Sequence, residues 1–275
     1  MILTNMTKDN AKLAKQYQSM TALEHISKKP DTYIGAVEED TTTTWTYDDK
    51  ENKIVYKSFN WVPGFYKCFD EALVNARDHQ VRMSLSKEKN KNLVKNIEVS
   101  CNNQAITVMN DGNGIDVAIH PKDKKWIPEM IFMHLRTSTN YDDEEKKLVG
   151  GKNGFGIKLV FIFAEWGIVE TVDHIRKLKY TQRVENNLSL IHKPKIEKYT
   201  GKPYTKVTWF PDYKRFGLKG MTDDIWNHLQ KRAYDIAGVT NKSMKVKLQD
   251  EIIPIKSFEQ YVDMYIGEKE VSKRI

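Results

Sequence analysis

Gly150-Gly151-Lys152-Asn153-Gly154-Phe155-Gly156-Ile157-Lys158 is the stretch that decides how this sequence folds. Its four glycines leave the backbone free to take positive φ and to approach a ligand without obstruction by side chains. The next residues, 157–164, lack Gly and Pro and predict a buried helix. The glycines therefore precede a helix N-terminus, where unpaired N–H groups and the positive end of the helix dipole favour a phosphate group.

Two familiar phosphate-binding motifs do not match this stretch. A P-loop has Lys and then Ser or Thr after its second glycine, whereas Ile157 and Lys158 follow Gly156. The dinucleotide-binding motif has a third glycine where Leu159 stands, and no clear strand precedes it. The stretch alone leaves two interpretations open, a phosphate-binding loop and a plain helix-capping loop.

Composition narrows the class of protein. The 275 residues are 40% hydrophobic and 29% charged, which is typical of a globular domain with a proper core. No apolar run approaches the ~20 residues that span a bilayer. Two cysteines imply no disulfide framework and favour a reducing, intracellular compartment. The net charge of +7 permits a nucleic-acid or phosphate partner, although an ordinary solvated Lys/Glu surface accounts for most of it.

A long helix is predicted from Pro63 to about Leu85. Its residues form an apolar face at helical spacing and, beside it, a polar stripe in which Glu and Asn stand one turn apart. An ordinary solvated face with an i,i+4 ion pair is the alternative for the stripe. The apolar face is Phe69, Ala72, Leu73 and Ala76, and the stripe is Glu71, Asn75, Asp78 and Arg82.

The rest of the pattern predicts one α+β domain, a mostly antiparallel sheet backed by helices. The polar, Gly-spaced turn 110–114 is expected at a strand end, and the acidic segment 137–152 is expected to form a lid. Hairpins are expected at 44–59, 95–109 and 244–255, and a meander at 167–172, 179–184, 188–191 and 205–210. Further helices are expected at 21–26, 128–134, 223–237 and 258–265.

Three motifs stand in the order and spacing of the GHKL ATPase superfamily: Glu71-x-x-x-Asn75, Asn110-x-Gly112-x-Gly114 and Gly151-x-x-Gly154-x-Gly156. That superfamily includes gyrase-type topoisomerases, 90-kDa heat-shock chaperones, MutL proteins and histidine kinases. Over about residues 17–265, the chain resembles the ATPase region of eukaryotic-type type IIA DNA topoisomerases. The blocks that carry this closer resemblance are 23–26, 30–35, 62–64, 137–143, 150–158 and 234–238.

The resemblance implies a Bergerat-type ATPase fold, with ATP and Mg²⁺ as cofactors. Glu71 matches the general base, Asn75 the Mg²⁺ ligand and Asn110 the residue that reads adenine. The lid residues match ribose and phosphate contacts, the glycine stretch matches phosphate contacts, and Tyr17 matches an arm residue that reaches the other subunit's nucleotide. The implied cofactor-binding set is Asn75, Asn110, Ser138, Thr139, Asn140, Gly151, Lys152, Asn153, Gly154, Phe155, Gly156, Ile157, Lys158 and Tyr17.

The resemblance also implies an organisation: a dimerisation arm at 1–30, the ATPase domain at 31–265, and the start of a transducer domain at 266–275. The family's Gln-x-Lys switch belongs to the transducer, which is expected to follow Ile275. In the whole enzyme the expected partners are double-stranded DNA and a second subunit, with no membrane. The expected location is the nucleus for a cellular protein, or an infected host cell for one from a large DNA virus.

Two points stay open. His79 stands where the eukaryotic enzymes usually have Asn, so the nucleotide contact that the resemblance implies at this position is left open for His79. The alternatives to an ATP-hydrolysing gate are a nucleotide-gated dimerisation module with negligible hydrolysis, and another GHKL ATPase such as a chaperone or MutL protein.

Overall fold

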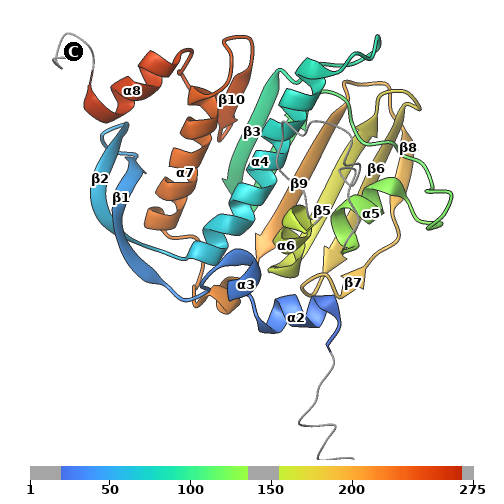
Figure 1. Cartoon of the computed structure of the whole chain (residues 1–275), viewed down its shortest axis with the longest axis horizontal. Helices are drawn as coiled ribbons and strands as arrows, with labels where there is room; N and C mark the ends of the chain where they lie inside the picture. The colour runs from blue at the N-terminus through green and yellow to red at the C-terminus, as the bar shows by residue number, and fades with distance from the viewer. Residues whose placement is uncertain (1–19, 136–154, 268–275) are drawn as a thin grey trace, which may run out of the picture.

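A nine-stranded sheet and a separate two-stranded hairpin organise the part of the chain that the structure describes. This structure is a computed structural model, and it describes residues 20–135 and 155–267 (Figure 1). The strands are β1 Asp40–Asp48, β2 Lys53–Trp61, β3 Asn96–Asn102, β4 Ala105–Asp111, β5 Ala164–Asp173, β6 Leu178–Glu185, β7 Leu190–Ile191, β8 Lys195–Lys198, β9 Tyr204–Pro211, β10 Lys245–Leu248 and β11 Glu251–Ile252. The helices are α2 Ala22–Lys28, α3 Asp31–Ile34, α4 Pro63–Leu85, α5 Ile127–Met133, α6 Gly156–Ile162, α7 Asp223–Gly238 and α8 Phe258–Ile266.

The sheet runs in the order β11-β10-β3-β4-β9-β5-β6-β7, and β8 also pairs with β6. Its pairs are antiparallel except β10 with β3, which is parallel. Helices α4, α5, α6 and α7 lie across one face of this sheet (Figure 1). The predicted α+β class, with a mostly antiparallel sheet backed by helices, is confirmed.

Local signals account for the helix boundaries. Thr21 and Glu24 form a capping box at the start of α2, with Thr21 Oγ1 accepting from the Glu24 backbone. Pro63 occupies the first turn of α4, where its missing N–H costs no helical hydrogen bond. The apolar face of α4 is buried as predicted, and Phe69 and Leu73 are fully enclosed. Burial of side chains of this size stabilises the fold by about 1.5–3 kcal/mol each.

Helix α6 lies at the centre of the helical layer, against α4, α5 and strand β5. Val160, Phe161 and Ile162 are completely buried. The helix places the end of the glycine stretch beside α4, so two motifs that are far apart in sequence lie next to each other.

Three expectations about the elements are wrong. The helix predicted through Ala164 ends at Ile162, and Ala164 begins β5 at a register shift in its pairing with β9. An apolar run that is buried on all sides does not distinguish the end of a helix from the start of a strand. The last strand of the expected meander, β9, does not pair with the strand before it in the sequence. It lies between β4 and β5 instead. The strand expected at 252–255 shortens to β11, and α3 and β8 were not expected.

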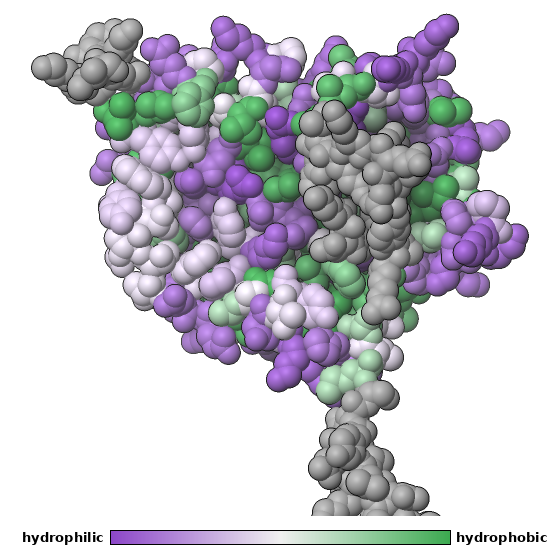
Figure 2. Space-filling view, in the orientation of Figure 1, coloured by the Kyte–Doolittle hydropathy of each residue, from purple (hydrophilic) through white to green (hydrophobic). Residues whose placement is uncertain are grey.

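The visible surface is mostly hydrophilic, as the charge content predicts (Figure 2). Hydrophobic residues gather over α8, whose Phe258 and Ile266 are both well exposed (Figure 2). Among the described helices, none combines the length and the apolar character needed to cross a membrane.

Candidate functional site

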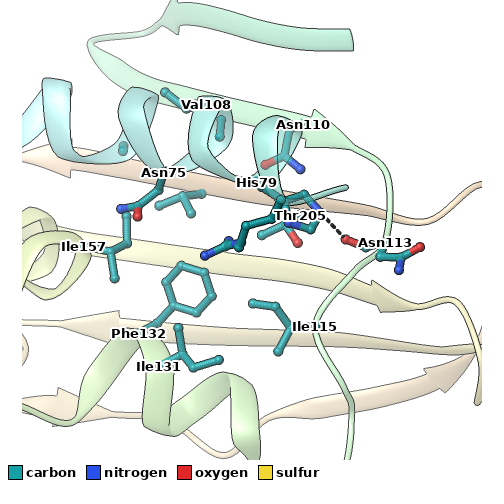
Figure 3. Close-up of a pocket in the computed structure, with 14 residues that line it drawn as sticks. Asn75, His79, Val108, Asn110, Asn113, Ile115, Ile131, Phe132, Ile157 and Thr205 are labelled. Atoms are coloured by element: carbon teal, nitrogen blue, oxygen red, sulfur yellow. Dashed lines mark hydrogen bonds between the residues drawn. The ribbon is translucent and has the colours of Figure 1, made fainter. Parts of the chain in front are cut away.

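A pocket opens between α4, α5, the turn after β4 and strand β9 (Figure 3). The cavity measures about 120 Å³, and both polar and apolar side chains line it. Asn75 and Asn110, two of the predicted site residues, line this pocket, and Ile157 brings the start of α6 to it. The other lining residues are Ala72, Ala76, His79, Arg82, Val108, Asn113, Ile115, Ile131, Phe132, Thr205 and Val207.

Glu71 lies one turn before Asn75 on α4, at the end of the site where the glycine stretch enters α6. Its Oε1 forms an ion pair of 2.5 Å with Lys67 Nζ. Its Oε2 lies so close to Gly156 that a Cβ added to this glycine would stand 1.9 Å from the oxygen. Only glycine leaves room for the carboxylate at this point, because real Cβ contacts are never so short. Oε2 is therefore the carboxylate oxygen that faces Gly156.

Asn75 is oriented by its own helix. Its Nδ2 donates a hydrogen bond of 2.6 Å to the backbone oxygen of Glu71, which turns the amide oxygen Oδ1 away from the helix. Among the described residues, no group of three or more His, Cys, Asp or Glu side chains could hold a metal by itself. An amide oxygen fits a hard cation such as Mg²⁺, which keeps several waters and takes its other ligands from substrate phosphates.

The turn after β4 approaches neighbouring backbone closely at two glycines. Gly112 has φ +99°, a conformation that side-chain-bearing residues rarely adopt. A Cβ on Gly114 would stand 1.8 Å from the backbone oxygen of Val172. The next residue, Ile115, donates its N–H to Thr171 Oγ1 over 2.9 Å. These contacts fix the turn that follows Asn110, which is 6% exposed.

Lys158 does not line the cavity. It is 2% exposed on α6, one residue after Ile157, and burial lowers the pKa of its ammonium from 10.5 to about 8. A nearby anion interacts strongly with a buried ammonium, because little water screens the charge. Phe155 precedes α6 and contacts Tyr33, with ring centroids 6.2 Å apart.

The remaining predicted site residues lie outside the described residues. They are Tyr17, Ser138, Thr139, Asn140, Gly151, Lys152, Asn153 and Gly154, and the expected lid 137–152 lies outside as well.

Sequence reasoning missed several residues of the pocket. Thr205 enters from β9, where its Oγ1 lies 2.9 Å from Thr171 Oγ1. Ile131 and Phe132 enter from α5, which the sequence identified only as a helix. Arg82 belonged to the polar stripe but received no role; burial lowers the pKa of its guanidinium, although the charge of Asp78 opposes this. Helical spacing from Glu71 and Asn75 is the signal that could have placed Arg82 in the pocket.

Comparison with known proteins defines the class first. No family model matches the chain. The fold matches the 43K ATPase domain of Thermus thermophilus gyrase B with a TM-score of 0.56 and 20% identity, over 84% of this chain and 50% of that one. At this identity the likeness shows the fold alone. Together with the three ordered motifs, the fold is that of a GHKL ATPase domain.

Closer relatives identify the branch of this class. The chain is 42% identical over 271 residues to DNA topoisomerase 2 of Saccharomyces cerevisiae, covering 98% of this chain and 18% of that protein. It is also 42% identical over 270 residues to DNA topoisomerase 2 of Acanthamoeba polyphaga mimivirus, covering 96% of this chain and 21% of that protein. The crystal structure of the ATPase region of S. cerevisiae topoisomerase II matches with a TM-score of 0.85 and 44% identity, over 91% of this chain and 65% of that one.

The chain is therefore homologous to the ATPase region of eukaryotic DNA topoisomerase 2. The family expected from the sequence is confirmed, in preference to a chaperone or MutL protein. The chain spans about a fifth of the length of these two curated relatives. A cellular and a viral relative are equally similar to it, so the choice between the two sources stays open.

Proposed function

We propose that this chain binds ATP with Mg²⁺ in the pocket beside α4 and hydrolyses the γ-phosphate, as the ATP-operated gate of a type II DNA topoisomerase. The position of Glu71 Oε2 against Gly156 is the observation that carries this proposal. This position supports the proposal because it puts a carboxylate oxygen beside the end of the loop that would hold the phosphates. Homology to an ATPase region supports the nucleotide.

The two oxygens of Glu71 would have different roles. Lys67 holds Oε1 and thereby fixes the rotamer of the carboxylate. Oε2 would accept a proton from the water that attacks the γ-phosphate. Positioning and charge stabilisation account for most of the catalysis in phosphoryl transfer, so a fixed carboxylate is a suitable general base.

The phosphates would be held by several groups. Asn75 Oδ1 would be a ligand of Mg²⁺, which when bound would neutralise the charge of the phosphates. Backbone N–H groups of residues 151–156 and the ammonium of Lys158 would contact the phosphates. Ser138, Thr139 and Asn140 would contact the ribose and phosphates, and Tyr17 would reach the nucleotide of the second subunit. Asn110 would read the adenine.

For the whole protein we infer ATP-driven passage of double-stranded DNA by a homodimer inside the cell. The proposed organisation is an arm at 1–30, the ATPase domain at 31–265 and the start of a transducer domain at 266–275. The nucleus is the proposed location for a cellular protein, and the infected host cell for a viral one.

A second candidate function is a nucleotide-gated dimerisation module that binds ATP and barely hydrolyses it. The family's switch lysine belongs to the transducer domain, so an ATPase domain acting by itself would supply one cation fewer at the γ-phosphate. Such preorganised groups are worth about 10²–10³ in rate.

Single-turnover hydrolysis separates the two candidates. The Glu71→Gln variant should bind ATP as the wild type does and lose about 10²–10⁴ of the rate, since an amide cannot accept the proton. Asn75→Ala should instead weaken Mg²⁺-dependent binding. Glu88→Gln, at an exposed position beyond α4, is the matched control and should change neither quantity. Equal, measurable rates for the wild type and Glu71→Gln would refute the role of Glu71. A wild type that binds ATP but hydrolyses it no faster than the uncatalysed background would leave the dimerisation module.

A further inference from the structure

His79 is the pocket residue to which the family motifs assign no role. It lies on α4 between Asn75 and Arg82 and faces the turn that follows β4 (Figure 3). Its Nε2 lies 2.8 Å from the backbone oxygen of Asn113. Asn113 is itself held in place, because its Oδ1 accepts hydrogen bonds of 2.7 and 3.0 Å from the backbone and side-chain nitrogens of Asn92.

This contact determines the tautomer of the imidazole. A backbone oxygen can only accept, so Nε2 must carry the hydrogen and donate it. Burial lowers the pKa of His79 to about 4, and the charge of Arg82 acts in the same direction, while the bond to Asn113 and the charge of Asp111 oppose them. The ring is therefore neutral near pH 7. In a neutral imidazole the second nitrogen carries a lone pair, so Nδ1 is a hydrogen-bond acceptor.

The acceptor is not fully buried, and it belongs to a residue that lines the cavity. Within residues 20–135 and 155–267, Nδ1 makes no hydrogen bond. Part of this atom's surface is reached by solvent, unlike that of the fully buried polar atoms that have no partner. His79 lies at the end of the pocket formed by the Asn110–Asn113 turn, whereas Asn75 and Ile157 line the other end (Figure 3). Glu71 and Gly156 lie next to that other end, since Glu71 is one turn from Asn75 on α4 and Gly156 directly precedes Ile157. If the phosphates lie towards Gly156, the nucleoside lies beside His79.

We propose that His79 is a specificity-determining residue of this pocket, and that its Nδ1 accepts a hydrogen bond from the nucleoside part of the bound nucleotide. This role presupposes that the pocket binds a nucleotide, which is the proposed function. Phosphate oxygens accept hydrogen bonds, so an acceptor cannot serve the triphosphate. A nucleoside offers two kinds of donor, the ribose hydroxyls and the amino group of adenine.

A histidine at this position differs chemically from an asparagine. An asparagine amide can rotate and present either its donor or its acceptor. His79 has committed its only N–H to Asn113, so it presents an acceptor alone. A site that accepts from a ligand N–H or O–H group discriminates against analogues that lack this group.

The test compares affinities for analogues that each lack one donor. Titration calorimetry with Mg²⁺ would measure ATP, 2′-deoxy-ATP, 3′-deoxy-ATP and purine riboside triphosphate, which lacks the 6-amino group. The proteins are the wild type, His79→Phe, which removes both ring nitrogens, and His79→Gln, whose amide can still donate to Asn113. His192→Phe changes an exposed histidine outside the pocket and is the matched control.

The wild type and His192→Phe should bind one analogue about 3- to 10-fold more weakly than ATP, and this ratio should fall towards one in His79→Phe. His79→Gln should keep part of the ratio, because its amide oxygen can still accept while its nitrogen donates to Asn113. If the ratio of ATP affinity to analogue affinity differs between the wild type and His79→Phe for a deoxy analogue, the donor is a ribose hydroxyl. If it differs for purine riboside triphosphate, the donor is the amino group of adenine. If every ratio is the same with and without His79, the proposal is overturned. Failure of the wild type to bind ATP at all would instead refute the proposed function, and the role of His79 with it.

Discussion

Replacing Lys158 with methionine should make the protein more stable without ligand while weakening its hold on ATP. The side chain is 2% exposed, and burial depresses its pKa from 10.5 to about 8. This depression corresponds to about 3 kcal/mol of unfavourable free energy for keeping the ammonium charged in the folded protein at neutral pH. Methionine fills a similar volume without charge, so part of this cost, on the order of 1–3 kcal/mol of unfolding free energy, should be recovered after the contacts of the ammonium are lost.

The pH dependence gives this prediction a definite sign. Between pH 8 and 10.5 the unfolded chain holds a proton on Lys158 that the folded protein has released, so the unfolding free energy of the wild type rises with pH in this window. The destabilisation is complete below about pH 8 and is gone above pH 10.5. The advantage of Lys158→Met should therefore be largest at pH 7 and should disappear towards pH 10.5.

Urea unfolding at pH 7, 8.5 and 10 would measure these free energies, and titration with ATP and Mg²⁺ would measure binding. The control is Lys231→Met, which removes a cation paired with Asp235 at 3.0 Å on α7 and should not stabilise the protein. A loss of stability in Lys158→Met at pH 7, or an advantage that does not change with pH, would refute the reasoning. In the wild type, ATP binding near pH 8 should take up protons, because phosphate charge favours the ammonium form.

Two further predictions concern residues around the site. Gly156→Ala should abolish hydrolysis while leaving the fold intact, because the new Cβ would stand 1.9 Å from Glu71 Oε2 and displace the carboxylate. Circular dichroism would check the fold and an ATPase assay the rate, and an unchanged rate would contradict the geometry. Asp173→Asn should cost about 1–3 kcal/mol, because the buried carboxylate accepts hydrogen bonds from the backbone of Val117 and Ile175. Burial raises the pKa of Asp173, but its hydrogen bonds have the larger effect and lower the pKa below 3.8. The stability advantage of the wild type over Asp173→Asn should therefore be lost as the pH falls below 3.8. Urea unfolding would measure this difference, and a difference that does not change with pH would contradict the role of the carboxylate.

Local sequence determined the elements that local physics controls. The capping box at Thr21 and Glu24, the Pro at the start of α4 and the Ser257 cap of α8 each act within one turn of helix, so the helix starts could be read directly. The order and spacing of the three motifs likewise indicated the GHKL superfamily, and the longer sequence blocks indicated the topoisomerase family. Helical spacing alone placed Glu71 and Asn75 on one side of α4.

Only the tertiary structure decided which of these residues meet. Periodicity shows which face of a strand is buried but not which strand lies beside it, so β9 between β4 and β5 could not be predicted, nor could Thr205 in the pocket. The bond from His79 to Asn113 joins residues that are 34 positions apart. The pKa of Lys158 depends on the packing that surrounds α6. Such contacts form between segments that only the complete fold brings together, and sequence spacing carries no measure of them.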